Sequence, residues 1–360
     1  MSQQSQTVSK MPKVGTKLNI PKIDLLLPVL WHPDNDVTEK QINTIDRPYM
    51  VAYFGSEDAA SAYIAQRIPA YGGLCYPHAK KDRLFSMLRM MNATTLMDEE
   101  FGNPEVQSSD VKCLELRRHY LAVLDGVPPP PGFPLVRLLF ETLQPIMAHI
   151  QPRVGARLVK IIREQVEVLA ARLRRQIDTL TFESYLELRR IDVFGEWATI
   201  LTEYAIDIDM TDELEADSAL KKMRNTVIDS VTLVNDLFSF RKEVQVQDPV
   251  NSLWVLMRQN KLDLQGAINR LAQIINENAR QIVVARDRVL AGKLGGRTDV
   301  RDYMVELGHL ASGNAEFHTF SARYHGLEFT GGRFTSGEVV IEALPSLHEI
   351  AAAKPTSSQG

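Results

Sequence analysis

The chain has 360 residues, of which 44% are hydrophobic and 24% are charged, which is an ordinary composition for a globular protein. Its formal net charge of -4 excludes a bulk basic surface for nucleic acid or an anionic membrane, so any site for a polyanion must be a local cluster. Two cysteines without paired spacing, Cys75 and Cys113, argue against a disulfide framework or a zinc site and favour a reducing cytoplasm.

The two termini are polar, and helical patterning dominates between them. Residues 1–20 lack an apolar signal core and are expected to form a flexible tail. Residues 327–360 are expected to form a lid or a second tail, with weak β character from Glu338 to Ala343. No apolar run is long enough to span a membrane.

Apolar residues at helical spacing, separated by prolines and glycines, predict one all-α domain over residues 21–326. Its long helices are expected to form an antiparallel bundle that encloses a central cavity. The predicted helices are Asp58–Arg67, Lys80–Met97, Ser108–Leu124, Leu135–His149, Val154–Ile177, Phe182–Ile206, Glu213–Val246, Leu264–Leu290 and Asp299–Tyr324.

The predicted helix Phe182–Ile206 carries two arginines among apolar neighbours. A guanidinium binds phosphate through two oxygens at once, and Asp192 lies one helical turn after Arg189, where it can orient that group. Gly195 weakens the helix just beyond, and a local break there would turn the carbonyl of Val193 away from its helical partner. A surface ladder of Glu and Arg gives the same pattern, so this segment alone does not identify a site.

An amide, a hydroxyl and a carboxylate recur at every fourth position of the next long helix, at Asn235, Ser239 and Glu243. Such residues stack along one face of a helix, so three hard oxygen ligands converge there. They suit a small hard cation such as Mg²⁺, which commonly shares its shell with substrate phosphates. A solvated helix face is the alternative, but apolar neighbours indicate a buried helix, in which unpaired polar groups are costly.

The nine residues 235–243, NDLFSFRKE, resemble the second metal-binding motif of class I terpene synthases in their microbial single-domain form. In that family an arginine that senses diphosphate precedes this motif at nearly the distance found here, 46 residues from Arg189 to Asn235. The pair Arg323-Tyr324, 88 residues after Asn235, is similar to the pair that closes over diphosphate in the family. The resemblance covers about residues 74–324.

The resemblance implies the class I terpenoid synthase fold, three Mg²⁺ ions and a role for each matching residue. Arg189 would be the diphosphate sensor, Asp192 its linker and Val193 the effector carbonyl. The expected metal ligands on the second motif are Asn235, Ser239 and Glu243, and the expected diphosphate contacts are Arg189, Asn235, Lys242, Arg323 and Tyr324. Phe317, where relatives often have Trp, is a candidate aromatic face for carbocations, with core packing as its alternative.

The match weakens at the family's first acidic motif, Asp-Asp-x-x-Asp/Glu. Asp98 fits its first position and Glu99 replaces the second Asp, while Gly102 and Asn103 stand where a later carboxylate is expected. Glu100 is a possible substitute from a shifted position. Asp98 is therefore an expected metal ligand together with Glu99 or Glu100, unless the two glutamates only solvate the helix end.

The implied activity is that of a terpene cyclase, a lyase that ionises a linear prenyl diphosphate with Mg²⁺, cyclises the carbocation and releases diphosphate. Residues 92–95, where many relatives place bulky aromatics, are Asn, Ala, Thr and Thr, which slightly favours geranylgeranyl diphosphate over farnesyl diphosphate. A prenyl chain-elongating synthase and a non-enzymatic helical scaffold are the alternatives. No nucleic acid or membrane partner is expected, and a homodimer is an open expectation because relatives are often dimers.

Overall fold

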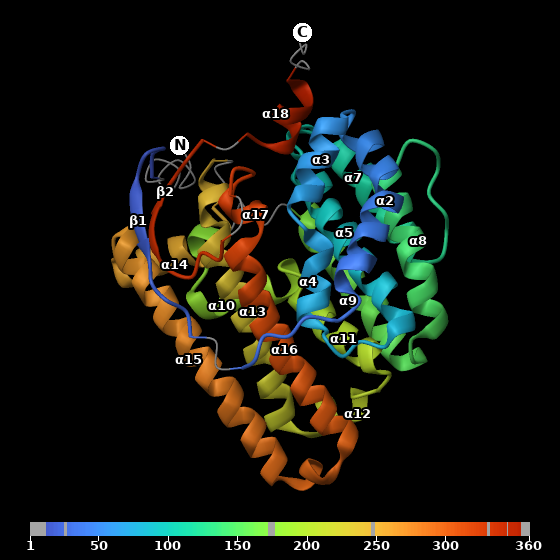
Figure 1. Ribbon diagram of the computed structural model, residues 1–360, viewed down its shortest axis with the longest axis vertical. Coiled ribbons are helices and arrows are strands. Elements are labelled where there is room, and N and C mark those ends of the chain that lie inside the picture. The colour runs from blue at the N-terminus through green and yellow to red at the C-terminus, as the bar shows by residue number, and fades with distance from the viewer. Residues whose placement is uncertain are drawn as a thin grey trace.

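The computed structural model describes residues 12–24, 27–171, 177–245, 249–329, 332–343 and 345–353, and helices dominate it (Figure 1). Its elements in chain order are β1 (Lys17–Ile20), α2 (Asn35–Phe54), α3 (Glu57–Ala65), α4 (Ile68–Cys75), α5 (Lys81–Gly102), α6 (Pro104–Ser108), α7 (Asp110–Leu124), α8 (Pro134–His149), α9 (Pro152–Ala170), η2 (Ile177–Thr179), α10 (Phe182–Asp192), α11 (Gly195–Ile206), α12 (Thr211–Ala216), α13 (Ser218–Gln245), α14 (Ser252–Asn260), α15 (Leu264–Ala291), η3 (Lys293–Gly296), α16 (Thr298–Phe320), α17 (Ala322–His325), β2 (Gly337–Val340) and α18 (Leu347–Ala352).

Short polar side chains mark where several helices begin. Ser56, Ser109, Thr181 and Asp263 each accept a hydrogen bond from a backbone amide in the first turn of α3, α7, α10 and α15. Proline at the first position begins α8 and α9, where its missing N–H has no helical partner to lose. These caps set the ends of helices whose apolar faces turn to the core.

The predicted helix Phe182–Ile206 is divided into α10 and α11, and the break predicted beside Val193 is confirmed. Phe194 adopts a left-handed φ of 67°, which ends the regular helix. The next residue must be small, because a Cβ on Gly195 would lie 2.4 Å from Cγ2 of Ile228 on α13. The close approach of α11 to α13 therefore requires glycine at the first position of α11.

Other helix boundaries differ from the prediction as well. The predicted helix Glu213–Val246 is α12 and α13, and Asp299–Tyr324 is α16 and α17. The predicted helix Val154–Ile177 ends as α9 at Ala170, and residues 172–176 lie outside the described residues. The sequence prediction missed α2, which is polar and contains Pro48, as well as the short helices α4, α6 and α14.

Two groups of helices build the fold. Figure 1 shows α13, α15 and α16 on one side and α2, α5 and α8 on the other, with α13 packed on α15 and α5 packed on α8. Helix α16 joins the groups because it packs against both α13 and α4. Its approach to α4 requires glycine, since a Cβ on Gly313 would lie 2.4 Å from the carbonyl oxygen of Leu74.

Segments near the two ends of the chain pair with each other. Strands β1 and β2 are antiparallel, with Lys17 opposite Val340 and Ile20 opposite Gly337. The weak β character predicted from Glu338 to Ala343 is confirmed as far as Val340, while the domain limits 1–20, 21–326 and 327–360 stay a prediction. None of the helices in the described ranges is both long and apolar enough to cross a lipid bilayer.

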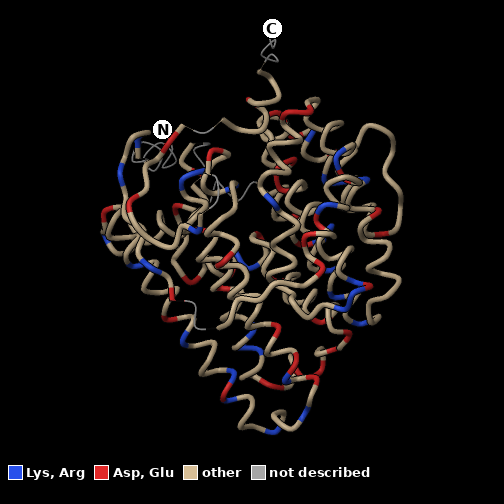
Figure 2. The backbone as a smooth tube through the Cα atoms, in the orientation of Figure 1, with Lys and Arg blue, Asp and Glu red and all other residues tan. Residues whose placement is uncertain are grey.

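Charged residues of both signs are mixed over the fold, as Figure 2 shows for Lys, Arg, Asp and Glu along the backbone. This distribution agrees with the small net charge. Cys75 and Cys113 are buried and unpaired in the described structure.

Candidate active site

Predicted site residues from four helices come together in space. Asp98 and Glu99 lie near the C-terminal end of α5, and Arg189 and Asp192 form the last turn of α10. The nine residues 235–243 lie near the C-terminal end of α13, and the pair Arg323-Tyr324 belongs to the short helix α17.

Ion pairs join the acidic end of α5 to α13 and α17. Oε1 of Glu99 lies 2.9 Å from Nζ of Lys242 and 2.7 Å from a guanidinium nitrogen of Arg323. Burial opposes the ionisation of Glu99, but the charges of Lys242 and Arg323 hold its pKa well below the usual range. Asp98 lies 3.8 Å from Arg323 and remains 41% exposed. Partial removal from water, and then the charge of Glu99, raise the pKa of Asp98, although the charge of Arg323 lowers it.

Glu100 lies apart from this group. Its carboxylate accepts a hydrogen bond of 2.6 Å from the hydroxyl of Tyr120 on α7. Burial raises the pKa of Glu100 to about 7, although the hydrogen bond from Tyr120 acts in the opposite direction. Of the two glutamates that the sequence left open, the structure brings only Glu99 to Asp98.

The amide of Asn235 is held on both sides. Its Oδ1 accepts a hydrogen bond of 3.2 Å from Arg189, and its Nδ2 lies 3.3 Å from the hydroxyl of Tyr324 and 3.2 Å from Nε2 of His318. The orientation of the amide is therefore defined by its partners, because the guanidinium of Arg189 can only donate and so faces Oδ1, while Nδ2 donates to the hydroxyl and the imidazole. The contacts also connect α13 to α10, α16 and α17.

The other two predicted ligands on α13 contact each other. The hydroxyl of Ser239 donates a hydrogen bond of 2.7 Å to Oε1 of Glu243. Oε2 of Glu243 accepts a second one, also of 2.7 Å, from the amide of Asn251. Asn251 is fully buried at the N-cap of α14 and also donates to the carbonyl of Asp236. The sequence prediction missed Asn251 because it missed α14.

Arg189 is fixed by two carboxylates. It pairs with Asp192 one turn later, as predicted, and lies 2.9 Å from Oδ1 of Asp236 on α13. Asp236 is fully buried and also accepts hydrogen bonds from the hydroxyl of Tyr185 at 2.7 Å and the backbone amide of Ser252 at 3.0 Å. Asp236 belongs to the nine-residue motif but was not selected from the sequence. Its neighbours Tyr185 and Arg189 lie four residues apart on one face of α10. This spacing could have indicated from the sequence that both side chains face the same partner.

His318 is a further residue that the predicted site did not include. Its Nδ1 lies 2.7 Å from the carbonyl of Asn314, so Nδ1 carries the proton and Nε2 accepts from Asn235. Burial lowers the pKa of His318 to about 3, so the ring is neutral near pH 7. The ring stacks on Tyr324 with centroids 4.3 Å apart. His318 therefore positions both Asn235 and Tyr324.

Arg323 and Tyr324 point into the site because the chain breaks between α16 and α17. Ser321 caps α17 and donates a hydrogen bond of 2.7 Å to the carbonyl of Gln66, which holds the turn in place. Phe317, one turn before the break, is buried and packs edge-on against Tyr71 with centroids 5.4 Å apart. It also packs edge-on against Tyr324, with ring centroids 6.2 Å apart. Phe317 is therefore both part of the core packing and a neighbour of the site.

The donor set suits a hard divalent cation. Asp98, Glu99, Asn235, Ser239 and Glu243 all offer oxygen, the ligand atom that Mg²⁺ prefers. Cationic and hydroxyl donors lie directly beside them, in contact with the same carboxylates and amide. Such an arrangement can hold a metal and a polyanion together.

Comparison with known proteins agrees with this geometry. The family described as terpene synthase family 2, C-terminal metal binding, matches residues 89–281, which include the five oxygen donors and Arg189 but not Phe317, Arg323 or Tyr324. The chain is 25% identical to microbial terpene synthase-like protein 13 of Selaginella moellendorffii over 81% of this chain and 83% of that protein. It is also 25% identical to (3S,6E)-nerolidol synthase of the same organism, over 90% of this chain and 87% of that protein.

Among solved structures, the SVS_A2 protein from ancestral sequence reconstruction aligns with a TM-score of 0.72. The alignment covers 83% of this chain and 90% of that chain at 21% identity, so it bears on the fold alone. It confirms the all-α fold that the sequence predicts.

Proposed function

Because this chain belongs to terpene synthase family 2, and is thus a lyase of the class I terpene synthases, we propose that it ionises a linear prenyl diphosphate and cyclises the cation. One observation carries this proposal. A continuous series of ion pairs and hydrogen bonds runs from Glu99 through the Arg323-Tyr324 pair to Asn235 and Arg189. It places proposed metal ligands and proposed diphosphate donors in contact, although they come from four different helices.

We assign the metal to oxygen donors on the two facing helices. Asp98 and Glu99 would hold Mg²⁺ from α5, and Asn235, Ser239 and Glu243 would hold it from α13, with three ions in total by family resemblance. Bound Mg²⁺ supplies positive charge that stabilises the departing diphosphate.

Arg189, Lys242, Arg323 and Tyr324 would bind the diphosphate oxygens in this proposal. Lys242 and Arg323 now pair with Glu99, and they would exchange this carboxylate for phosphate oxygens. The exchange would also release Glu99 to act as a metal ligand. The same carboxylate thus keeps the two cations in position until the substrate arrives.

Arg189 would sense the diphosphate, and Asp192 would link this contact to the break after α10. The carbonyl of Val193, at the C-cap of α10, is our proposed effector that faces the substrate. Phe317 would stabilise carbocations through its ring face while it packs against Tyr71.

We propose geranylgeranyl diphosphate over farnesyl diphosphate as the substrate. Thr94 and Thr95 lie one turn before Asp98 on the same side of α5, and their small side chains would leave room for a longer prenyl chain below the diphosphate. Asn92 does not contribute to this argument, because its amide donates a hydrogen bond of 3.2 Å to Asp46 on α2.

A chain-elongating synthase would need a second Asp-rich motif, and α13 carries an amide, a hydroxyl and a carboxylate instead. A homodimer and a cytoplasmic location are further parts of the proposal.

The direct experiment incubates the purified chain with Mg²⁺ and each of the C10, C15 and C20 prenyl diphosphates, and identifies products by mass spectrometry. We expect a cyclic terpene and released diphosphate, with the highest kcat/KM for the C20 substrate and no product without Mg²⁺. Higher kcat/KM for the C15 substrate would overturn the assignment of chain length alone. No terpene from any substrate, or elongated diphosphates when isopentenyl diphosphate is added, would overturn the proposed cyclase.

A further inference from the structure

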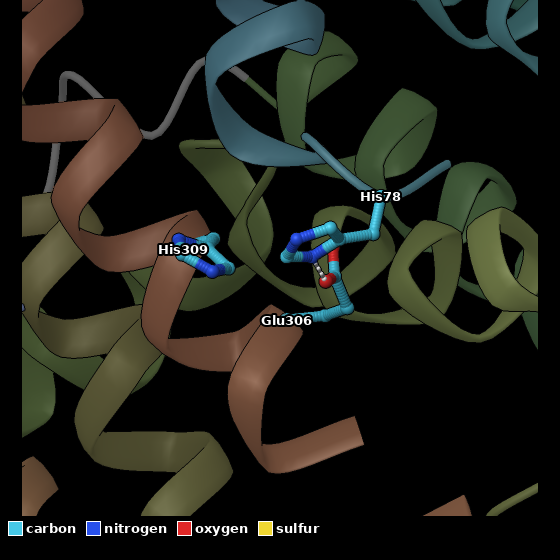
Figure 3. A group of neighbouring side chains, drawn as sticks. All are labelled: His78, Glu306 and His309. Carbon is cyan, nitrogen blue, oxygen red and sulfur yellow. Dashed lines mark hydrogen bonds and ion pairs between the residues drawn. The ribbon is translucent and has the colours of Figure 1, made fainter. Parts of the chain in front are cut away.

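A second group of metal-ligating side chains lies outside the candidate active site. Figure 3 shows His78, Glu306 and His309, whose ligand atoms all lie within 4.8 Å of one another. Glu306 and His309 are three residues apart on one face of α16, and His78 follows α4 in the segment that leads to α5. The three side chains therefore converge from two separate parts of the chain.

Two buried polar atoms in this group have no hydrogen-bond partner among the described residues, Oε2 of Glu306 and Nδ1 of His309. The other carboxylate oxygen, Oε1, lies 2.5 Å from Nδ1 of His78. Glu306 is only 2% exposed and His309 only 5%. Leaving such atoms buried and unpaired costs free energy, which a cation bound between them would offset.

The donor set differs in kind from that of the candidate active site. Two imidazoles and one carboxylate suit Zn²⁺ and neighbouring transition metals, whereas Mg²⁺ prefers oxygen ligands alone. His309 also donates a hydrogen bond to the carbonyl of Pro28, a contact of the type that orients metal-binding imidazoles. His78 is 51% exposed at its side chain, which gives an ion a path from solvent and leaves room for a water ligand.

We propose that His78, Glu306 and His309 bind one divalent transition metal of the Zn²⁺ class. The ion would tie the segment between α4 and α5 to α16, and through His309 it would support the contact with Pro28. Its role is structural, because binding to the folded chain alone raises the stability of the fold. The site is independent of the proposed Mg²⁺ chemistry, because it shares no residue with it.

The test uses the full chain after treatment with a chelator, without Mg²⁺ or diphosphate. Titration with Co²⁺, followed by its visible absorption, and titration with Zn²⁺, followed by calorimetry, should each show one bound equivalent. His309→Ala and His78→Ala should weaken Co²⁺ binding by at least about 100-fold, because loss of even an outer partner of a metal ligand costs about 10- to 100-fold. His149→Ala, which removes an imidazole from the last turn of α8, is the matched control and should bind Co²⁺ like the wild type.

Glu306→Gln keeps the shape of the buried side chain and removes its charge, so it provides a second test if an alanine variant does not fold. Absence of the single equivalent in the wild type would overturn the proposal. Equal Co²⁺ affinity in the wild type, His78→Ala and Glu306→Gln would overturn it as well. Asn235→Ala should still bind Co²⁺ here, so failure of the proposed cyclase and failure of this site give different results.

Discussion

The two helices that face each other across the candidate active site hold their polar groups in different ways. On α13, Asn235 is held by the neutral imidazole of His318 and the phenol of Tyr324 as well as by the guanidinium of Arg189, and Glu243 is held by an amide and a hydroxyl. On α5, Asp98 and Glu99 face cationic side chains that we propose as diphosphate donors. The wall on α13 is thus preorganised mainly by neutral hydrogen bonds, whereas the wall on α5 is organised by charges that a polyanion can displace.

The largest loss of activity is expected from a change to the α13 wall, whose side chains are preorganised by hydrogen bonds. Asn235→Ala removes a proposed metal ligand and leaves Arg189 and Tyr324 without a partner that they share. We expect kcat/KM to fall by roughly 10³-fold or more, as for removal of a group that stabilises charge in the transition state. The helical circular dichroism spectrum should remain unchanged, and product formation is measured by mass spectrometry.

Asn225→Ala on the same helix is the matched control for this change. Asn225 is half-buried and lies ten residues before Asn235, about 15 Å away along α13, so its loss should leave turnover near the wild-type rate. Wild-type turnover in Asn235→Ala would remove α13 from the proposed metal site.

The charged wall on α5 is tested by changing Glu99, which belongs to it, and its neighbour Glu100, which does not. Glu99→Gln removes the carboxylate that pairs with Lys242 and Arg323, and we expect kcat/KM to fall on the order of 100-fold. Glu100→Gln changes a carboxylate that faces Tyr120, so its activity should stay near that of the wild type. Steady-state kinetics with varied Mg²⁺ compares the two variants. If Glu100→Gln loses more activity than Glu99→Gln, the assignment of the two residues is reversed.

A smaller effect is expected from His318, which acts through Asn235. His318→Ala frees the amide of Asn235 to rotate, and we expect kcat/KM to fall by about 10-fold, as is usual for partners of metal ligands. His318→Gln keeps an acceptor and should recover part of the loss. The apparent affinity for Mg²⁺ should weaken in His318→Ala, which a role in packing alone would not produce.

The pH profile adds a second check on this histidine. Because its pKa is about 3, the imidazole of His318 remains uncharged near pH 6 to 7. If kcat/KM of the wild type depends on pH between 6 and 7, the same dependence should therefore remain in His318→Ala and His318→Gln. Its disappearance would mean that His318 titrates during turnover.

Contacts within one helix were predictable from the sequence, whereas contacts between helices were not. The pairs Arg189–Asp192 and Ser239–Glu243 follow from helical spacing, and both form. The choice between Glu99 and Glu100 depends on where other helices place their cations and Tyr120. Adjacent residues point about 100° apart on a helix, so only tertiary packing separates them.

Apolar periodicity predicted the all-α fold correctly but not all of its boundaries. Phe194 ends α10 with a positive φ, a conformation that its residue type does not signal. Helix α14 is short, and missing it meant missing Asn251 as a partner of Glu243. The resemblance to class I terpene synthases is confirmed by the family match, while the roles of the individual site residues stay predictions.

The smallest effect concerns stability and again separates the two glutamates of α5. Burial raises the pKa of Glu100 to about 7 from an ordinary 4.5, so between these values the folded chain holds a proton that the unfolded chain has released. The stabilisation is fully present below pH 4.5 and is lost as the pH rises through 7, with a total on the order of 3 kcal/mol. Urea unfolding at several pH values between about 5 and 8 measures this loss.

Glu100→Gln resembles the protonated side chain at every pH, so its unfolding free energy should lack this part of the pH dependence. Glu277→Gln, an exposed change on α15, should keep the wild-type dependence. An equal slope in the wild type and Glu100→Gln would contradict a raised pKa at this position. A flatter slope in Glu100→Gln would place the proton on Glu100 near neutral pH, where a metal ligand has to be deprotonated, and would leave Glu99 as the glutamate of the charged wall.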